Sequence, residues 1–208
     1  MSRAAHEQVL VLARAPVAGR CKTRLIPARG ARGAARVHAR LLRHCLQQVA
    51  GASRPVQLLG APDTRHAIFS ELRRRHDCRL GRQSPGDLGR RMLAALNQAL
   101  RAGRTAAVLV GSDCAALTPA HLDAAFNALR TGNDAVLQPA EDGGYVLIGL
   151  RRAAPAHLLE GIDWSSGHEL RQTRTRLQRA GFRLKLLEPL WDVDHPRDLR
   201  RAHRLGLL

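Results

Sequence analysis

Short apolar runs alternate with longer amphipathic segments along the whole chain. The apolar runs are rich in Val, Leu and Ile and are bounded by Gly, Pro or Asp, which is typical of buried strands. We expect strands at Val9–Leu12, Val56–Leu59, Ala106–Val110, Ala135–Leu137, Tyr145–Ile148 and Leu184–Leu187. Between them, helical spacing of the apolar residues predicts helices at Ala34–Val49, Arg65–Arg75, Leu88–Arg101, Pro119–Arg130 and His168–Ala180. This alternation predicts an α/β protein with a mostly parallel sheet covered by helices on both faces.

The chain is 208 residues long and contains no internal repeat, low-complexity tract or linker. We therefore expect a single domain over residues 1–208, in which Gly51–Pro55 and Gly81–Gly86 are loops. A domain of this size buries a core large enough to carry a cleft. In such sheets ligands bind beyond the carboxyl ends of the strands, so the residues that follow each strand are the candidates for a site.

The first candidate segment is Ala13–Leu25, ARAPVAGRCKTRL, which follows the first expected strand. A glycine lets backbone N–H groups approach a phosphate, and clustered cations neutralise several phosphate oxygens at once. The alternative is an ordinary strand-to-helix connection with solvated arginines. The segment has neither the P-loop pattern nor the Gly-x-Gly-x-x-Gly of dinucleotide binders. As a nucleotide-phosphate loop it would bind through Ala13, Ala15, Gly19, Arg20, Lys22, Thr23 and Arg24.

A second candidate, Gly111-Ser112-Asp113-Cys114, follows the strand expected at Ala106–Val110. An aspartate at the carboxyl end of a strand can coordinate a divalent cation or hold a ribose hydroxyl, and Gly111 and Ser112 would line the same nucleotide site. The alternative is a helix cap or turn residue without a ligand.

A third candidate, Glu141–Tyr145, places paired glycines between a carboxylate and a strand. Gly143 and Gly144 would let the backbone approach a sugar or an acceptor, Asp142 would orient a hydroxyl or act as a base, and Tyr145 would lie against the substrate. The alternative is a simple hairpin turn.

A fourth candidate is Asp192-Val193-Asp194. Alternate residues of an extended segment lie on the same side, so both carboxylates can approach one cation. Because phosphate oxygens supply further ligands, Asp113 with either Asp192 or Asp194 suffices for Mg²⁺ or Mn²⁺. The alternative is a turn in which Asp194 caps a helix over His195–Arg204.

The formal net charge of +17 suggests nucleic-acid binding as an alternative function. The excess is arginine spread along the chain, and aromatic residues make up only 3% of it, which leaves few platforms for stacking bases. Arg32, Arg36, Arg40 and Arg43 share one face of a predicted helix, as expected of a solvated face. The charge therefore favours anionic small molecules over a specific nucleic acid.

No run of about 20 apolar residues is present, and the N-terminal apolar run is too short for a signal peptide, so we expect a soluble, cytoplasmic protein. Cys21, Cys45, Cys78 and Cys114 lie far apart without metal-ligand spacing, which favours reduced thiols over a zinc site. The oligomeric state has no signature in the sequence.

Six motifs in order resemble the DUF2064 family over roughly Val9 to Asp198. They are ARAPVAGRCKTRL, GDLGRRM (Gly86–Met92), GSDC (Gly111–Cys114), PAEDGGYVLIGL (Pro139–Leu150), WSS (Trp164–Ser166) and DVD (Asp192–Asp194). Members are described as glycosyltransferase-A-fold proteins, of the arsenosugar-biosynthesis or rSAM/selenodomain-associated type. The resemblance implies a nucleotide-diphospho-sugar transferase fold, a three-layer α/β/α sandwich, with a divalent metal at the sugar-nucleotide site.

By this resemblance, Lys22 and its neighbouring arginines hold phosphates, and Mg²⁺ or Mn²⁺ on Asp113 and Asp194 stabilises the leaving diphosphate. Asp142 positions the acceptor or acts as the general base. The expected function is transfer of a sugar from a nucleotide diphosphate to a small acceptor. The alternatives are a nucleotidylyltransferase, because Pro16–Leu25 is similar to the loop of phospholactate guanylyltransferases, and a nucleotide-binding module without turnover.

Overall fold

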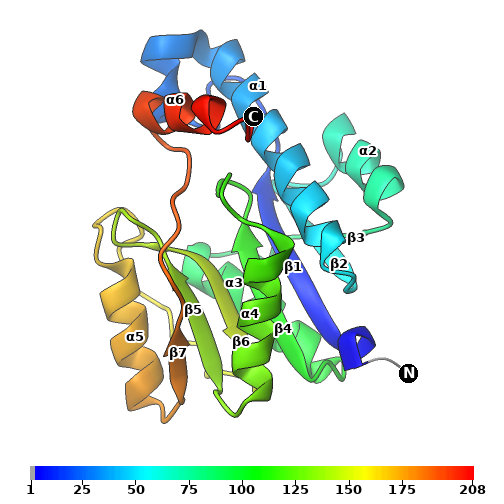
Figure 1. The fold of residues 1–208 in the computed structure, drawn as a ribbon, viewed down its shortest axis with the longest axis vertical. Helices are drawn as coiled ribbons and strands as arrows, with labels where there is room; N and C mark the ends of the chain where they lie inside the picture. The colour runs from blue at the N-terminus through cyan, green and yellow to red at the C-terminus, as the bar shows by residue number, and fades with distance from the viewer. Residues whose placement is uncertain (1–2) are drawn as a thin grey trace.

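The computed structural model describes residues 3–208, so Met1 and Ser2 of the N-terminal segment lie outside the described residues. Its strands form one seven-stranded sheet in the order β3-β2-β1-β4-β6-β5-β7 (Figure 1). The strands are β1 Glu7–Arg14, β2 Val56–Ala61, β3 Arg79–Arg82, β4 Ala106–Gly111, β5 Ala135–Pro139, β6 Tyr145–Leu150 and β7 Leu184–Leu186. Strand β6 runs antiparallel to both β4 and β5, and every other pairing is parallel.

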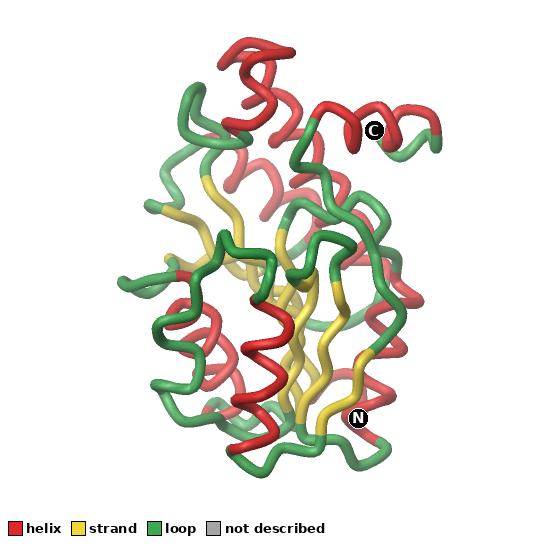
Figure 2. The backbone as a smooth tube through the Cα atoms, turned by 90° about the vertical axis from the view of Figure 1, so that its left-hand side faces the viewer, coloured by secondary structure: helices red, strands yellow, loops and turns green. Residues whose placement is uncertain are grey.

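The sheet lies between two layers of helices, which Figure 2 shows on both sides of the yellow strands. The helices are α1 Ile26–Gly51, α2 Ala67–His76, α3 Leu88–Arg101, α4 Pro119–Arg130, α5 Glu169–Arg179 and α6 Pro196–Arg204, with short 3-10 turns η1 Arg3–His6 and η2 Thr23–Leu25. Alternate residues of β1 face opposite layers: Val9 and Val11 pack with α1, α2 and α4, whereas Leu10 and Leu12 pack with α3 and α5. The α/β prediction, and the three-layer sandwich that the family resemblance implies, are confirmed.

The expected elements are present, and those with strong periodicity end where the sequence predicts. Helices α3 and α4 match their predicted bounds, and α4 begins with a capping box between Thr118 and His121. Helix α1 starts at Ile26, before the predicted start at Ala34. Its first turn is joined to the rest of the helix across a kink at Gly30, whose φ is 65°.

Strand β3 was missed, and the loop predicted at Gly81–Gly86 is wrong for its first two residues. Gly81 and Arg82 belong to β3, which pairs parallel with β2 at the sheet edge. Its sequence, RLGR, has one apolar side chain and two arginines, because an edge strand with little buried surface needs no apolar pattern.

The strand order places β1 and β4 side by side in the middle of the sheet, so their carboxyl ends lie at the centre of one end of it. From β1 the chain continues to β2 and β3 on one side, and β4 then pairs with β1 on the other side. Such a switch point opens a crevice where loops diverge. Helix α6 closes over this end by packing Leu199 and Ala202 against Leu41 of α1. None of the helices within residues 3–208 is long and apolar enough to cross a membrane.

Candidate functional site

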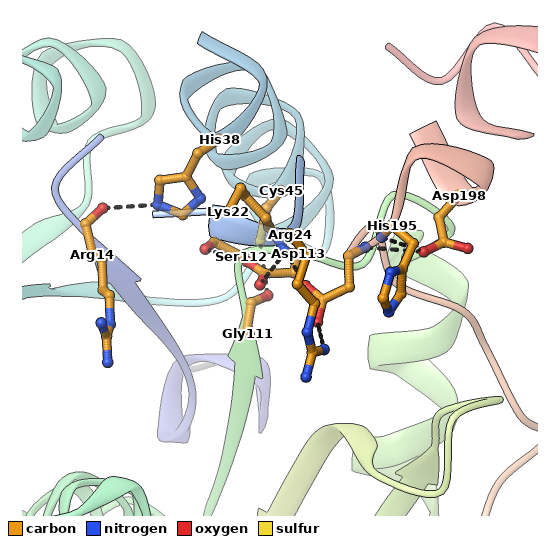
Figure 3. Close-up of polar contacts among 11 residues, drawn as sticks. Arg14, Lys22, Arg24, His38, Cys45, Gly111, Ser112, Asp113, His195 and Asp198 are labelled. Atoms are coloured by element: carbon orange, nitrogen blue, oxygen red, sulfur yellow. Dashed lines mark hydrogen bonds and ion pairs between the residues drawn. The ribbon is translucent and has the colours of Figure 1, made fainter. Parts of the chain in front are cut away.

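Lys22 lies between two aspartates that are far from it in sequence, Asp113 and Asp194. Figure 3 shows Lys22 beside the first of them, Asp113. Lys22 Nζ donates to Asp113 Oδ2 at 2.6 Å and to Asp194 Oδ1 at 2.7 Å. Arg24 Nη1 donates to Asp194 Oδ2 at 2.8 Å. The Lys22 side chain is only 4% exposed, whereas those of Asp113 and Asp194 are 38% and 32% exposed. The first, second and fourth candidate segments therefore meet in one ionic cluster.

The backbone aims Lys22 into this cluster. Lys22 has φ 46° and ψ 46°, a left-handed conformation that costs a residue other than glycine about 1–2 kcal/mol. Asp113 follows β4, and its carbonyl accepts the Val193 N–H at 3.1 Å, which ties the segment after β7 to the end of β4. Backbone strain at a charged cluster is typical of functional sites.

The cluster shifts the pKa values of its own groups. Burial alone would lower the pKa of Lys22, but the carboxylates of Asp113 and Asp194 outweigh it and raise the pKa above its ordinary value. Burial likewise opposes ionisation of Asp113, and the Lys22 ammonium outweighs it, so that the pKa of Asp113 is lowered. The lysine is charged and Asp113 is ionised at neutral pH.

Two cavities meet at this cluster. The larger has a volume of about 1050 Å³ and the smaller about 680 Å³. Both are lined by Arg24, Asp113 and Asp194, with Leu88, Gly111 and Trp164 on the same shared wall. A ligand that spans the two cavities would cross the charged cluster at its middle.

The smaller cavity lies over the ends of β1 and β4. It is lined by six of the predicted nucleotide-binding residues, namely Ala13, Arg20, Lys22, Thr23, Gly111 and Ser112, as well as by the shared Arg24. Three predicted binding residues do not line either cavity: Ala15, Gly19 and Gly143. Ala15 is buried in the core, and Gly19 adopts a positive φ of 78° in an open turn.

The larger cavity contains most of the third candidate segment. Asp142, Gly144 and Tyr145 line it, and Asp142 Oδ1 accepts the Gly144 N–H at 3.0 Å. The segment joins the antiparallel strands β5 and β6, so it is also a hairpin connection. The hairpin and the ligand-site interpretations therefore describe the same loop. Burial raises the pKa of Tyr145, whose hydroxyl accepts from Thr173 Oγ1 at 3.4 Å.

Gly143 faces the loop before α5 instead of the cavity. Its φ is 93°, and a Cβ placed on it would overlap the carbonyl oxygen of Gly167. Its own carbonyl accepts the Leu170 N–H at 3.1 Å. Gly143 therefore admits the backbone of Gly167, and it does not line the cavity where the predicted sugar or acceptor would bind.

Replacing Gly143 by alanine is expected to destabilise the protein by about 2–4 kcal/mol, because a strained φ and a steric overlap add together. Urea unfolding followed by circular dichroism measures the loss. The matched control is Gly161→Ala, since Gly161 has φ 66° but an added Cβ there meets nothing within 4 Å. The control should lose only about 1 kcal/mol from backbone strain. Equal losses in the two variants would contradict the contact with Gly167.

Asp192 and Asp194 take different positions. Asp194 joins the Lys22 cluster, while Asp192 is half-buried and lines the larger cavity. Burial, together with the nearby carboxylates of Asp194 and Asp142, raises the pKa of Asp192 to about 7. Asp194 does not cap α6. The cap is His195, and Asp198 Oδ2 accepts the His195 N–H at 2.7 Å.

The predicted metal ligands match a hard divalent cation in charge and in donor type, because all are carboxylates. In residues 3–208, however, no group of three or more such side chains is arranged to hold a metal ion. Each Oδ atom of Asp194 has a cationic partner, and Lys22 stands between Asp113 and Asp194. Asp113 and Asp194 can therefore share a metal cation only if Lys22 moves out from between them.

Sequence reasoning missed several residues at this site. His38 is buried, and its Nε2 donates to the Arg14 carbonyl at 3.0 Å, which fixes the end of β1 (Figure 3). Burial lowers the pKa of His38 and favours the neutral ring. The available signal was a histidine at an inward position of an amphipathic helix. Gln83 and Trp191 were missed as cavity-lining residues because no local pattern marks them.

Several solved structures share this fold. A protein from Desulfovibrio desulfuricans G20, described as a candidate nucleotide-diphospho-sugar transferase, is 28% identical, with a TM-score of 0.86 over 97% of this chain and 88% of that chain. A 4-diphosphocytidyl-2C-methyl-D-erythritol synthase from Anaerococcus prevotii DSM 20548 is 10% identical, with a TM-score of 0.64 over 99% of this chain and 100% of that one.

A third similar structure is glucosyl-3-phosphoglycerate synthase from Mycobacterium tuberculosis, in complex with Mn²⁺, UDP and glucosyl-3-phosphoglycerate. It is 12% identical, with a TM-score of 0.54 over 97% of this chain and 76% of that one. At such low identities the last two structures establish the fold alone. A comparison with curated proteins finds no matching sequence.

Residues 41–166 match the family described as "Uncharacterized protein conserved in bacteria (DUF2064)". The match covers more than half of the chain and includes Asp113 of the ionic cluster and Asp142, Gly144 and Tyr145 of the larger cavity. Together with the fold, it confirms the resemblance carried by the sequence motifs. The chain therefore belongs to the DUF2064 family.

Proposed function

We propose that this protein is a nucleotide-dependent transferase that moves a sugar from a nucleotide diphosphate to a small acceptor, with Mg²⁺ or Mn²⁺. One observation carries the proposal. A buried lysine holds two aspartates together where two cavities meet, beyond the carboxyl ends of β1 and β4. A donor needs cations for its phosphates and an adjoining space for its acceptor, and the cluster separates two such spaces.

The smaller cavity is the proposed donor site. Lys22, Arg20 and Arg24 supply positive charge, and forked guanidinium groups pair well with phosphate oxygens. The Lys22 ammonium would leave the two aspartates for the diphosphate. Asp113 and Asp194 would then hold the metal, which stabilises charge on the leaving diphosphate when it is bound.

The larger cavity is the proposed acceptor site. Asp142 lies in a loop with both glycines, and its carboxylate is oriented by the Gly144 N–H. In this position it would hold the acceptor hydroxyl and receive its proton as transfer proceeds. Tyr145 stays neutral because burial raises its pKa, so it would contact the acceptor as a neutral ring.

The comparisons support a nucleotide-binding transferase more broadly than a particular reaction. Among similar structures, one is described as a candidate nucleotide-diphospho-sugar transferase and another as a cytidylyltransferase. The second candidate is therefore nucleotidylyl transfer, in which a nucleoside triphosphate would occupy the smaller cavity. The third candidate, nucleotide binding without turnover, predicts no need for a divalent cation.

A thermal-shift panel tests these candidates. Nucleoside diphosphates, triphosphates and nucleotide sugars are each added with and without Mg²⁺ or Mn²⁺, because a bound ligand raises the melting temperature. At a hundred times the dissociation constant, we expect a rise of roughly 5–10 °C for the correct donor.

Metal-dependent stabilisation by a diphosphate and its sugar conjugate supports glycosyl transfer and identifies the base. Stabilisation mainly by one triphosphate would favour nucleotidylyl transfer. No metal-dependent shift with any nucleotide would contradict both reactions.

A further inference from the structure

One face of α6 carries three arginines along the wall of the larger cavity. Arg197, Arg201 and Arg204 are spaced four and three residues apart, which places them on one side of a helix. Leu199 and Ala202 of the same helix are buried against α1 and fix the orientation of α6. Because the apolar face of α6 packs against α1, the face with the three arginines lines the cavity.

Arg201, the central arginine, is already engaged. Its Nη1 donates to Glu141 Oε2 at 2.8 Å, and its guanidinium carbon lies 4.4 Å from the centre of the Trp191 ring. These contacts join α6 to the loop after β5 and to the segment before α6. Arg201 is an anchor of the cavity wall, with one arginine on each side of it.

The side chains of the two flanking arginines are free to bind a ligand. The Arg204 side chain is exposed and has no hydrogen bond or ion pair within residues 3–208. Arg197 has a 79% exposed side chain whose only ion pair among these residues is with Asp198, at 3.4 Å. Asp198 Oδ2 is in turn held by the backbone N–H groups of Asp194 and His195.

The same cavity is also lined by carboxylates that have no cationic partner among residues 3–208. Asp113 and Asp194 are neutralised by Lys22 and Arg24, and Glu141 by Arg201. In the described part of the chain, this leaves Asp142, Asp192 and Glu169 without a cationic side-chain partner on the cavity wall. The cavity therefore combines carboxylates that can accept from hydroxyl groups with arginines that can bind an anion.

We propose that the acceptor is a hydroxyl compound with an anionic group, a carboxylate or a phosphate, which Arg197 and Arg204 bind. This inference rests on the proposed function. A hydroxyl group of the acceptor lies toward Asp142, and the anion lies against α6, where forked guanidinium groups bind carboxylate and phosphate oxygens in pairs. The arginines select the acceptor and hold it in one orientation across the cavity.

The test compares three probes that share a three-carbon frame: glycerol 3-phosphate, glycerate and glycerol. Their binding is followed by NMR titration and calorimetry, with the diphosphate that best stabilises the protein present to fill the phosphate loop. We expect at least one anion to bind and glycerol not to bind, and the preferred anion identifies phosphate or carboxylate. In the double variant Arg197→Ala/Arg204→Ala, affinity for this anion should fall about ten- to a hundredfold.

Arg200→Ala is the matched control, because Arg200 is exposed on the same helix but does not line either cavity. It should retain the wild-type affinity. Equal loss in the control and the double variant, no loss in either, or anion binding no tighter than that of glycerol would overturn the inference.

The double variant should also keep its nucleotide-dependent thermal shift, since neither arginine lines the smaller cavity. Loss of that shift in the double variant alone would also overturn the inference. If no nucleotide raises the melting temperature of the wild-type protein, the proposed function fails. The anion titration on the free protein then still tests whether the α6 arginines bind an anion.

Discussion

Replacing Lys22 by methionine is expected to weaken nucleotide binding at least tenfold while raising the affinity of the free protein for Mn²⁺ and Mg²⁺. The methionine has a similar length but no charge, so it removes the ammonium that lies 2.6 Å from Asp113 and 2.7 Å from Asp194. The two carboxylates then face each other without a cation between them. Their repulsion is relieved by a divalent cation, and calorimetry with Mn²⁺ alone measures the gain.

The same variant should lose about 1–3 kcal/mol of stability without metal. The loss is below that of a fully buried ion pair because both carboxylates are about one-third exposed. Added Mn²⁺ should restore part of it. The matched control is Lys185→Met, at the only other lysine, which is exposed on β7. If Lys22→Met bound nucleotide as tightly as this control, Lys22 would not belong to the phosphate site.

Replacing Asp113 by asparagine is expected to remove the metal dependence of nucleotide binding and to weaken that binding about a hundredfold. Asparagine keeps the shape and loses the charge. Substituting a residue that hydrogen-bonds to a metal ligand typically lowers metal affinity about 10- to 100-fold, and losing a ligand itself should lower it at least as much. Lys22 keeps Asp194 as a partner, so the fold should survive. Calorimetric titration of the nucleotide with and without Mg²⁺ measures both effects.

Asp77→Asn is the control for this substitution. Asp77 is exposed, lines neither cavity and has φ 45°, a conformation that asparagine tolerates well. It should bind nucleotide and metal as the wild type does. An Asp113→Asn protein with unchanged affinity and unchanged response to Mg²⁺ would show that the metal assignment is wrong.

The elements of the fold could largely be predicted from the sequence. Burial on one helix face or on alternate strand residues leaves a local period, which is why the bounds of α3 and α4 match. Where burial is weak, the period disappears. Strand β3, with arginines at both ends, was missed for this reason, and the start of α1 was hidden by the kink at Gly30.

The candidate site could be predicted in its residue types but not in its pairing. Turn residues and charges after β1 and β4 pointed to Lys22 and Asp113, because the carboxyl ends of strands are where ligands bind. No local signal indicated that Lys22 itself would hold the aspartates, or that the arginines of α6 would line a cavity.

The sequence alone determined the alternation of strands and helices except β3, the α/β class and the segments that carry chemistry. The tertiary structure decided which of these segments meet. Lys22 and Asp194 are 172 positions apart, and their contact depends on how β1, β4 and the segment before α6 are placed around the end of the sheet. A periodic pattern reports only the environment of its own element, whereas a contact between distant elements depends on the packing of all the layers between them.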